Sequence, residues 1–379
     1  MNFKCKYSTY CGACKNLDRN FDTELQEKTD FVSNLFKDYD VSVQKCIGSY
    51  YPMKYRNKVH LAFTELKGKT LIGFFEQGST KVTDIDDCIH YDKWLSVLIS
   101  ILREYVSRFK IKPYKDGYGT IRYAHARCID NKIQLTLVVS TDNFAGRDWL
   151  YDKLSKYYSE VSLYININRR TDRAIFDQKF KFVKGNKYLE FTLCGVKVAI
   201  SPNSFLQVNL PIAEKMYKES LQLLNITKDT TVLDLYSGIG ITSIMFSKYA
   251  KEVFAIEEVS SAVENAKYMA KLNNRNNIHF MLGKCEEKIN SIKFNNATDL
   301  VVFVDPARAG MDKSVINALK LVKPRTIVYM SCNPETCVRD IKYITNDKNY
   351  YIYAIKPYAM FPYTNHVEML SCLKIKEEK

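Results

Sequence analysis

The sequence contains no run of apolar residues that approaches the ~20 needed to cross a membrane as a helix. Its first fifteen residues, MNFKCKYSTYCGACK, also lack the apolar centre of a secretory signal peptide. Both absences predict a cytoplasmic protein that does not associate with membranes. Because the cytoplasm keeps thiols reduced, we expect the eleven cysteines to be thiols or metal ligands rather than disulfides.

Internal repeats, low-complexity tracts and linkers rich in Pro, Gly or Ser are also missing, so a domain boundary must be found from a change of pattern. The chain has 379 residues, of which 46% are hydrophobic, which excludes disorder and is enough for two domains. Lys and Arg number 56 against 42 for Asp and Glu, giving a net charge of +14. This excess favours a polyanionic partner, either nucleic acid or anionic lipid.

The two halves of the chain differ in hydrophobic pattern. In the first half we expect strands at 57–66, 70–76, 132–140 and 161–168 and a helix at 92–109. From about residue 209 amphipathic helices alternate with short apolar strands, ending with the strand 326–331. This order predicts an α/β, Rossmann-like domain, a parallel sheet with helices on both faces, over residues 205–379. Residues 1–204 are predicted to form an α+β domain.

Ligands of such sheets lie beyond the carboxyl ends of the strands, so residues at strand ends are candidate site residues. The segment VLDLYSGIGITS places Gly238 and Gly240 after a strand, with Ser243 where a dinucleotide fingerprint has its third glycine. The next strand ends in Glu257, which is suited to hold ribose hydroxyls. The alternative is an ordinary tight turn. We expect an adenosine-containing ligand, and the missing glycine favours S-adenosylmethionine, which has no phosphate.

Two further strands end in residues that can carry chemistry. The strand 300–304 leads into Asp305, and the strand 326–331 leads into Cys332. Asn333 can cap a helix that Pro334 begins, and the N-terminus of that helix is expected to lower the thiol pKa below ~8.5. The alternative is an inert buried cysteine.

The C-terminal segment MFPYTNHVEMLSC places Glu368 at the start of an apolar run. Partial desolvation there is expected to raise its pKa towards that of a working general base, although a solvated strand residue is the alternative. A thiolate, a methyl-donor pocket and a carboxylate base are the minimal set for methylating an unactivated pyrimidine carbon.

The motifs ISPNSFLQVN, DLYSGIG, DPARAG, SCNPETCVRD and MFPYTNHVE together resemble those of the S-adenosylmethionine-dependent RNA uridine-5-methyltransferases. The resemblance spans residues 200–368. It implies that Cys332 is the nucleophile and Glu368 the base, and that Phe205 and Arg308 face the target nucleotide. The cofactor-binding residues it implies are Gln207, Tyr236, Gly238, Gly240, Glu257 and Asp305. At Ile241 the chain departs from the polar residue that many members carry.

The N-terminal segment holds Cys5, Cys11 and Cys14 in a C-x5-C-x2-C spacing, with Cys88 following in DIDDCIHY. The residues alone fit either zinc or an iron-sulfur cluster. The resemblance to the ribosomal-RNA members of the family implies a 4Fe-4S cluster bound by these four cysteines. The other cysteines are expected to be buried hydrophobes or surface thiols: Cys46, Cys128, Cys194, Cys285, Cys337 and Cys372.

Because the chain begins at this cysteine segment, we expect it to lack the family's optional N-terminal RNA-binding barrel. It therefore resembles the compact members that modify large-subunit (23S) ribosomal RNA, with transfer RNA as the alternative substrate and a monomer as the expected state. The rival hypotheses are a DNA cytosine methyltransferase, a thiol redox or zinc protein, and a noncatalytic RNA-binding iron-sulfur protein. The first typically has its cysteine in a Pro-Cys motif, which this chain lacks at Cys332. The second would leave the methyl-donor motif and Glu368 without a role, and the third would not need Cys332.

Overall fold

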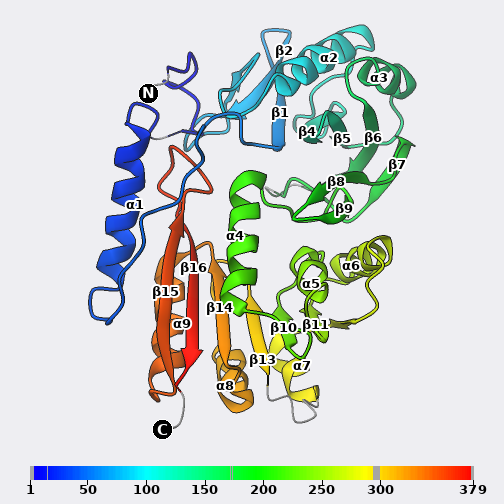
Figure 1. Ribbon diagram of the computed structural model, residues 1–379. Coiled ribbons are helices and arrows are strands. Elements are labelled where there is room, and N and C mark those ends of the chain that lie inside the picture. The colour runs from blue at the N-terminus through cyan, green and yellow to red at the C-terminus, as the bar shows by residue number, and fades with distance from the viewer. Residues whose placement is uncertain (1–3, 15, 171, 173, 293–298, 377–379) are drawn as a thin grey trace. The chain divides into compact units, whose positions relative to one another are not determined.

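The computed structural model describes residues 4–14, 16–170, 172, 174–292 and 299–376 (Figure 1). The described residues form two compact units. The first lies within 1–19, 51–191 and 199–203, and the second within 20–50, 192–198 and 204–379. The chain passes between the units in the two-stranded hairpin of β8 (Leu189–Leu193) and β9 (Val196–Ile200).

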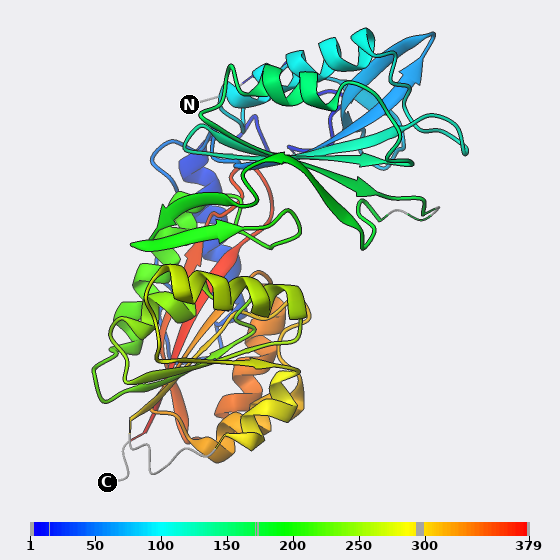
Figure 2. The ribbon, with the colours of Figure 1, turned by 90° about the vertical axis from the view of Figure 1, so that its right-hand side faces the viewer.

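The first unit is built on a seven-stranded sheet with the order β3-β2-β1-β4-β5-β6-β7 (Figure 2). Its strands are β1 (Lys58–Leu66), β2 (Lys69–Phe75), β3 (Val82–Asp84), β4 (Ile121–Ile129), β5 (Lys132–Val139), β6 (Glu160–Ile167) and β7 (Phe180–Gly185). Only β5 and β6 pair in parallel, and helix α3 (Arg147–Leu154) connects them, as a parallel crossover requires. Helix α2 (Trp94–Arg108) contributes its apolar side to the same core as β1, β4, β5 and β6.

The second unit contains the predicted doubly wound sheet, with the order β12-β11-β10-β13-β14-β16-β15. Its strands are β10 (Thr231–Leu235), β11 (Glu252–Glu257), β12 (Ile278–Leu282), β13 (Leu300–Val304), β14 (Thr326–Ser331), β15 (Tyr350–Tyr358) and β16 (Glu368–Ile375). The pairs from β12 to β14 are parallel, which confirms the prediction. The last two strands form an antiparallel hairpin at one edge, with β16 next to β14.

Helices cover both faces of this sheet. Helices α1 (Phe21–Leu35), α8 (Lys313–Val322) and α9 (Pro334–Thr345) share one core with alternate residues of the strands. Helix α4 (Leu210–Leu224) contacts β13, β14 and β16, while α5 (Ile241–Ser247) and α6 (Ser260–Leu272) contact β11 and β12. The short α7 (Cys285–Lys288) and a 3-10 turn (Ile289–Ser291) contact α8.

Two stretches, residues 20–50 and 192–198, lie in a different unit from the domain that the sequence assigned to them. Residues 20–50 were expected in the first domain, but they belong to the second unit. The physical reason is that Val32 and Phe36 of α1 are buried in the core beneath the second sheet. Residues 43–47 then run along β15 through bridges from Val43 to Ile355 and from Ile47 to Tyr358. The functions assigned to the two domains stay predictions.

Among the described residues, no helix is both long and apolar enough to span a membrane.

Candidate active site

The strand register of the second sheet places Cys332 beside Glu368. Ser331, the last residue of β14, is paired with Met369 in the antiparallel strand β16. Cys332 follows Ser331 and Glu368 precedes Met369, so both lie one residue beyond this last pair, and the Glu368 carboxyl acts on the Cys332 thiol. Asp305 follows β13, the parallel neighbour of β14 on its other side. Three residues predicted from separate motifs therefore meet at one edge of the sheet.

The turn after β14 has the predicted cap. Asn333 is the N-cap of α9, with its side chain accepting a hydrogen bond from the Glu335 amide, and Pro334 opens the helix. Ser331 Oγ accepts a hydrogen bond from the Asn333 amide at 3.1 Å. These bonds satisfy backbone donors that the start of a helix leaves open, and they fix the main chain on both sides of Cys332.

The 305–311 loop that carries Arg308 is tied to α9. Asn333 Nδ2 and Thr336 Oγ1 each donate to the Arg308 carbonyl at 3.2 Å. The buried carboxylate of Asp340 accepts the Met311 amide at 2.8 Å. Since the loop carbonyls and amides are held by α9, Arg308 keeps its place near the residues at the ends of β14 and β16.

The predicted fall in the Cys332 pKa is wrong for this structure. Burial raises the pKa of the Cys332 thiol to about 11, and the carboxyls of Glu368 and Asp305 add to the rise. The Arg308 guanidinium opposes it. Desolvation penalises the thiolate more than the helix N-terminus and Arg308 stabilise it.

Glu368 has the raised pKa that its place at the start of an apolar strand predicts. Its side chain is buried, with 5% of the residue exposed. Burial raises the pKa of Glu368 to about 8, Asp305 adds to this, and Arg308 opposes it. Burial, together with Asp234, raises the pKa of Asp305 to about 7. These two carboxyl groups can therefore gain and lose protons near neutral pH, as a general base must.

The glycine-rich turn after β10 has the geometry expected of a cofactor loop. Tyr236, Gly238 and Gly240 all have positive φ, at 59°, 54° and 78°. A Cβ on Gly240 would lie 3.0 Å from the Cβ of Ala266 in α6, so this position also needs glycine for packing. At Gly238 and Gly240 the turn has no side chains, so a ligand can approach its main chain at the strand end where adenosine is expected.

Glu257 at the end of β11 faces this turn. Its carboxylate accepts the amides of Gly238 and Val259, each at 2.9 Å. Each carboxylate oxygen keeps capacity for another donor, so these bonds orient Glu257 and leave room for ribose hydroxyls. The arrangement fits the adenosine part of S-adenosylmethionine.

Asp234 in β10, which we did not select from the sequence, binds the start of α5 just after the glycine-rich turn. It is fully buried and accepts hydrogen bonds from Thr242 Oγ1 at 2.8 Å and Ser243 Oγ at 2.5 Å. Burial raises its pKa to about 6. Ser243, which stands where a dinucleotide fingerprint has glycine, has a defined task in binding this carboxylate. An aspartate inside an apolar strand was the available signal.

The segment before α4 carries the remaining predicted residues. Ser204 Oγ donates to Asn265 Oδ1 of α6 at 2.8 Å, which anchors the segment. Gln207 is buried, whereas Phe205 is 67% exposed. Phe205 thus presents an exposed aromatic ring on an anchored segment.

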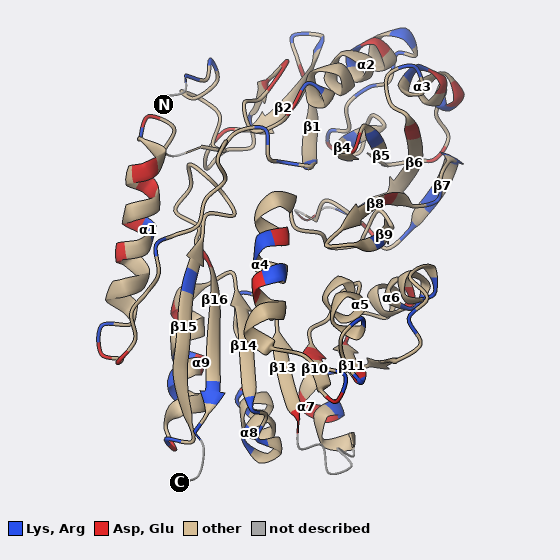
Figure 3. Ribbon diagram, viewed as in Figure 1, with Lys and Arg blue, Asp and Glu red and all other residues tan. Residues whose placement is uncertain are grey.

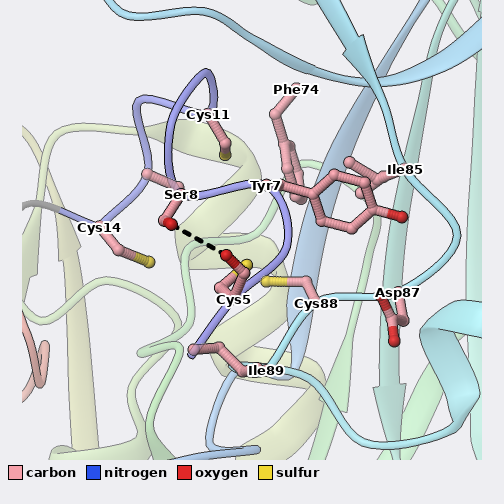
Figure 4. Close-up of a pocket in the computed structure, with 11 residues that line it drawn as sticks. Cys5, Tyr7, Ser8, Cys11, Cys14, Phe74, Ile85, Asp87, Cys88 and Ile89 are labelled. Carbon is pink, nitrogen blue, oxygen red and sulfur yellow. Dashed lines mark hydrogen bonds between the residues drawn. The ribbon is translucent and has the colours of Figure 1, made fainter. Parts of the chain in front are cut away.

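The four predicted metal-binding cysteines lie together in the first unit. Cys5, Cys11, Cys14 and Cys88 line one small hollow with apolar walls that include Phe74 (Figure 4). Figure 4 shows their sulfur atoms turned towards this hollow. Within the described part of the chain, no group of three or more His, Cys, Asp or Glu is placed to hold a metal ion. The structure therefore shows the grouping of the thiols and not a formed metal centre.

Two residues beside these cysteines were not selected from the sequence. His90 Nε2 lies 2.8 Å from Cys14 Sγ. Burial raises the pKa of Cys14 to about 12 and of Cys88 to about 11, and the Arg56 guanidinium opposes both changes. A single histidine and a single arginine gave no pattern that could have identified them.

Three comparisons place the chain among known proteins. A family model described as tRNA (Uracil-5-)-methyltransferase matches residues 20–376. An uncharacterized RNA methyltransferase of Oceanobacillus iheyensis is 32% identical over 377 residues, covering 97% of this chain and 82% of that protein. One of Streptococcus mutans is 34% identical over 339 residues, covering 88% and 75%.

A solved structure agrees with these matches. The crystal structure of Pyrococcus abyssi tRNA (uracil-54, C5)-methyltransferase in complex with S-adenosyl-L-homocysteine is similar over 96% of this chain and 86% of that chain, with a TM-score of 0.79 and 26% sequence identity. The second unit accordingly has a Rossmann-like methyltransferase fold. The chain belongs to the tRNA (uracil-5-)-methyltransferase family and is an S-adenosylmethionine-dependent RNA methyltransferase.

Proposed function

We propose that this protein methylates carbon 5 of a uridine in RNA through a covalent adduct on Cys332. The observation that carries the proposal is the register of β14 and β16, which sets a thiol and a buried carboxyl side by side. Carbon 5 of uracil is a poor nucleophile, and addition of a thiolate at carbon 6 turns the ring into an enolate that is nucleophilic at carbon 5. S-adenosylmethionine, when bound, supplies the methyl group that carbon 5 takes up.

Cys332 forms the adduct. Its sulfur bonds to carbon 6 while the electron pair of the carbon 5–carbon 6 double bond moves into the enolate. The thiol pKa of about 11 makes the thiolate scarce in the free protein. Because the pKa values of Glu368 and Asp305 are raised, both carboxyl groups are partly neutral near pH 7 and then repel the thiolate less.

Glu368 ends the reaction as general base. Its carboxylate takes the proton from the methylated carbon 5, the carbon 5–carbon 6 double bond forms again, and the sulfur–carbon 6 bond breaks. Glu368 thus returns Cys332 to its starting state, and both groups must reach the same ring. Their adjacent positions in one strand pair meet this requirement.

A uridine in a stacked helix cannot reach this edge, so the target nucleotide must be turned out of its stack. This costs a few kcal/mol and is cheapest in a loop. Phe205, with its exposed ring, is the proposed stacking surface, and Arg308 the proposed contact to the nucleotide. Lys and Arg are spread over helices and strands of both units (Figure 3). Charge by itself therefore does not mark one RNA-binding surface.

For the substrate, we propose a uridine of 23S ribosomal RNA, in line with the resemblance to the compact members of the family. Transfer RNA is the second candidate, and the similar Pyrococcus structure, whose title names tRNA uracil-54, favours it. The proposal includes a cytoplasmic, monomeric protein. Mapping 5-methyluridine by mass spectrometry in both RNA classes, from cells with and without the gene, tests it. If 5-methyluridine stays in both RNA classes when the gene is absent, the proposed function is overturned.

We also propose that Cys5, Cys11, Cys14 and Cys88 hold a 4Fe-4S cluster. Four thiols around one apolar hollow have the donor chemistry of such clusters. A bound cluster would cross-link the N-terminal segment to the loop after β3. The methylation transfers no electrons, so the cysteines are assigned a structural role. Stoichiometric zinc without iron in anaerobically purified protein would contradict the cluster and leave the four ligands in place.

A further inference from the structure

Helix α1 carries two charged side chains that are buried in the second unit. The side chains of Glu24 and Lys28 are 2% and 5% exposed, and Lys28 Nζ lies 3.2 Å from Glu24 Oε1. Moving two charges out of water is costly, and a buried pair often contributes little net stability. The pair therefore calls for an explanation other than stability.

Both side chains bind the main chain of the β15–β16 loop, residues 359–367. The Tyr363 amide donates to both carboxylate oxygens of Glu24 at 2.9 Å. Lys28 Nζ donates to the carbonyl of Thr364 at 2.5 Å and to that of His366 at 2.7 Å. The last of these contacts is two residues before Glu368. Hydrogen bonds to charged groups are stronger than those between neutral groups. These bonds therefore hold the main chain of a loop that has no strand partner there among the described residues.

The loop conformation needs such support. Tyr363 has a φ of 61°, in the left-handed region that bulky residues rarely adopt. Its amide is the group that Glu24 holds, and its ring lies 5.7 Å from that of Phe21, at the start of α1. Backbone strain of this kind persists only where the surroundings determine it, and it is common at functional sites.

The other side of the loop is also fixed. Asn209, the N-cap of α4, donates from Nδ2 to the Met360 carbonyl at 3.0 Å, and the Ala359 amide donates to the Ile47 carbonyl at 2.9 Å. The loop is thus anchored near its start by these bonds and near its end by the Glu24–Lys28 pair. Glu368 itself is paired with Tyr358 in the β15–β16 ladder, and the Glu24–Lys28 pair fixes the main chain that leads into it.

We propose that Glu24 and Lys28 are positioning residues for Glu368: by binding the main chain at Tyr363, Thr364 and His366, they set where the carboxylate stands when the proton leaves carbon 5. The inference rests on the proposed function, in which Glu368 is the general base. Neither residue touches the reacting atoms. Their loss should slow the step that Glu368 performs and leave the steps of Cys332 and the cofactor site intact.

The test uses the double variant Glu24→Met/Lys28→Met. Methionine has a similar length and a high helix propensity, and removing both charges together avoids leaving one of them buried alone. The matched control is Gln26→Met/Asp30→Met, which removes an exposed 2.8 Å hydrogen bond with the same spacing on the same helix. Circular dichroism and S-adenosylhomocysteine binding show whether each variant is folded.

Three rates are measured in single turnover: adduct formation with 5-fluorouridine RNA, methyl transfer to ordinary RNA, and release of the methylated adduct. In the double variant we expect release to slow by about 10- to 100-fold, since a shift of ~1 Å can have such an effect. Adduct formation and methyl transfer should change by less than about threefold, whereas a general loss of structure would slow all three steps. Glu24→Met alone should slow release at least as much as the double variant. Lys28→Arg alone keeps the donors and the charge, so it should slow release less than the double variant.

Release at the control rate in a folded double variant would overturn the positioning role. So would an equal slowing of all three steps. Failure of the proposed function looks different, because the wild-type protein would then form no adduct with 5-fluorouridine RNA.

Discussion

Asn333 Nδ2 donates a hydrogen bond to the carbonyl oxygen of Arg308 at 3.2 Å. The bond joins the turn after β14 to the loop after β13, and so links the residue that follows Cys332, the proposed nucleophile, to the residue whose guanidinium acts on its thiol. Arg308 opposes the rise of the pKa of both Cys332 and Glu368. The Asn333 side chain both caps α9 and holds the loop that carries Arg308. The position of the Arg308 charge near Cys332 therefore depends on this one side chain.

Replacing the proposed nucleophile, Cys332→Ala, should lower methylation by roughly 10⁴-fold or more, because the attacking group is removed. S-adenosylmethionine affinity should stay within about threefold, since the glycine turn and Glu257 are unchanged. Methyl transfer from labelled cofactor and calorimetric binding measure the two effects. Cys337→Ala, at the buried cysteine of α9, is the control for a lost thiol. Normal turnover by Cys332→Ala would exclude the adduct mechanism.

Glu368→Gln should accumulate a methylated protein–RNA adduct, because addition and methyl transfer precede the step of the base. We expect its release to be slower by about 10²- to 10⁴-fold. A denaturing gel with labelled RNA shows the adduct as a shifted band, and mass spectrometry shows the added methyl group. If no band forms, Glu368 acts before methyl transfer.

The raised pKa of Glu368 predicts a change of stability with pH. Between the ordinary pKa of 4.5 and the folded value of about 8, only the folded state keeps the proton. Stability from the neutral carboxyl is therefore complete below pH 4.5 and is lost as pH rises through about 8. Glu368→Gln removes this dependence, so the Tm of the variant relative to wild type should increase from pH 5 to pH 8.5. The corresponding change in the free energy of unfolding has an upper bound of about 5 kcal/mol.

Thermal unfolding of the cofactor-free protein across this range is the measurement. The exposed Glu65→Gln serves as control and should show no such trend. A constant difference between Glu368→Gln and wild type would show that the carboxyl is ionised in the fold.

Gly240→Ala should weaken S-adenosylmethionine binding by about tenfold or more. The added Cβ meets Ala266 at 3.0 Å in a backbone conformation with a φ of 78°, so the turn must shift. Gly195→Ala is the matched control, since Gly195 has a φ of 71° with no atom within 4 Å of the added Cβ. Both changes should cost about 1 kcal/mol of backbone strain, but only the first should change cofactor affinity. If the two variants bind S-adenosylmethionine with equal affinity in calorimetry, the glycine-rich turn is not part of the cofactor site.

Cys88→Ser should remove bound iron and sulfide from anaerobically purified protein and lower its Tm. Closing a long loop contributes about 4 kcal/mol in the chain-entropy description, and this is lost with the ligand. RNA binding should weaken, while S-adenosylmethionine affinity should stay unchanged. Cys128→Ser, at a buried cysteine of β4, controls for the substitution. Retention of stoichiometric iron by Cys88→Ser would exclude Cys88 as a ligand.

The sequence by itself determined the five parallel strands β10 to β14 of the second sheet and the residues at their ends, but it did not predict the edge strand β15. Apolar strands alternating with amphipathic helices admit few arrangements, and parallel strands bring their carboxyl ends to one edge. Asp305 and Cys332 could therefore be predicted to lie near the cofactor turn. The cap at Asn333 was also predictable, because the signal and its effect lie within a few residues.

Only the tertiary structure decided the contacts between distant segments. The place of Glu368 beside Cys332 depends on the antiparallel register of β16, which neither strand encodes alone. The pKa of Cys332 depends on burial and neighbouring carboxyls, which outweighed the local helix effect. The contact between Glu24 and Tyr363 joins positions 339 apart, and it exists because α1 packs in the second unit. Local pattern fixes local geometry, whereas desolvation and register are properties of the assembled core.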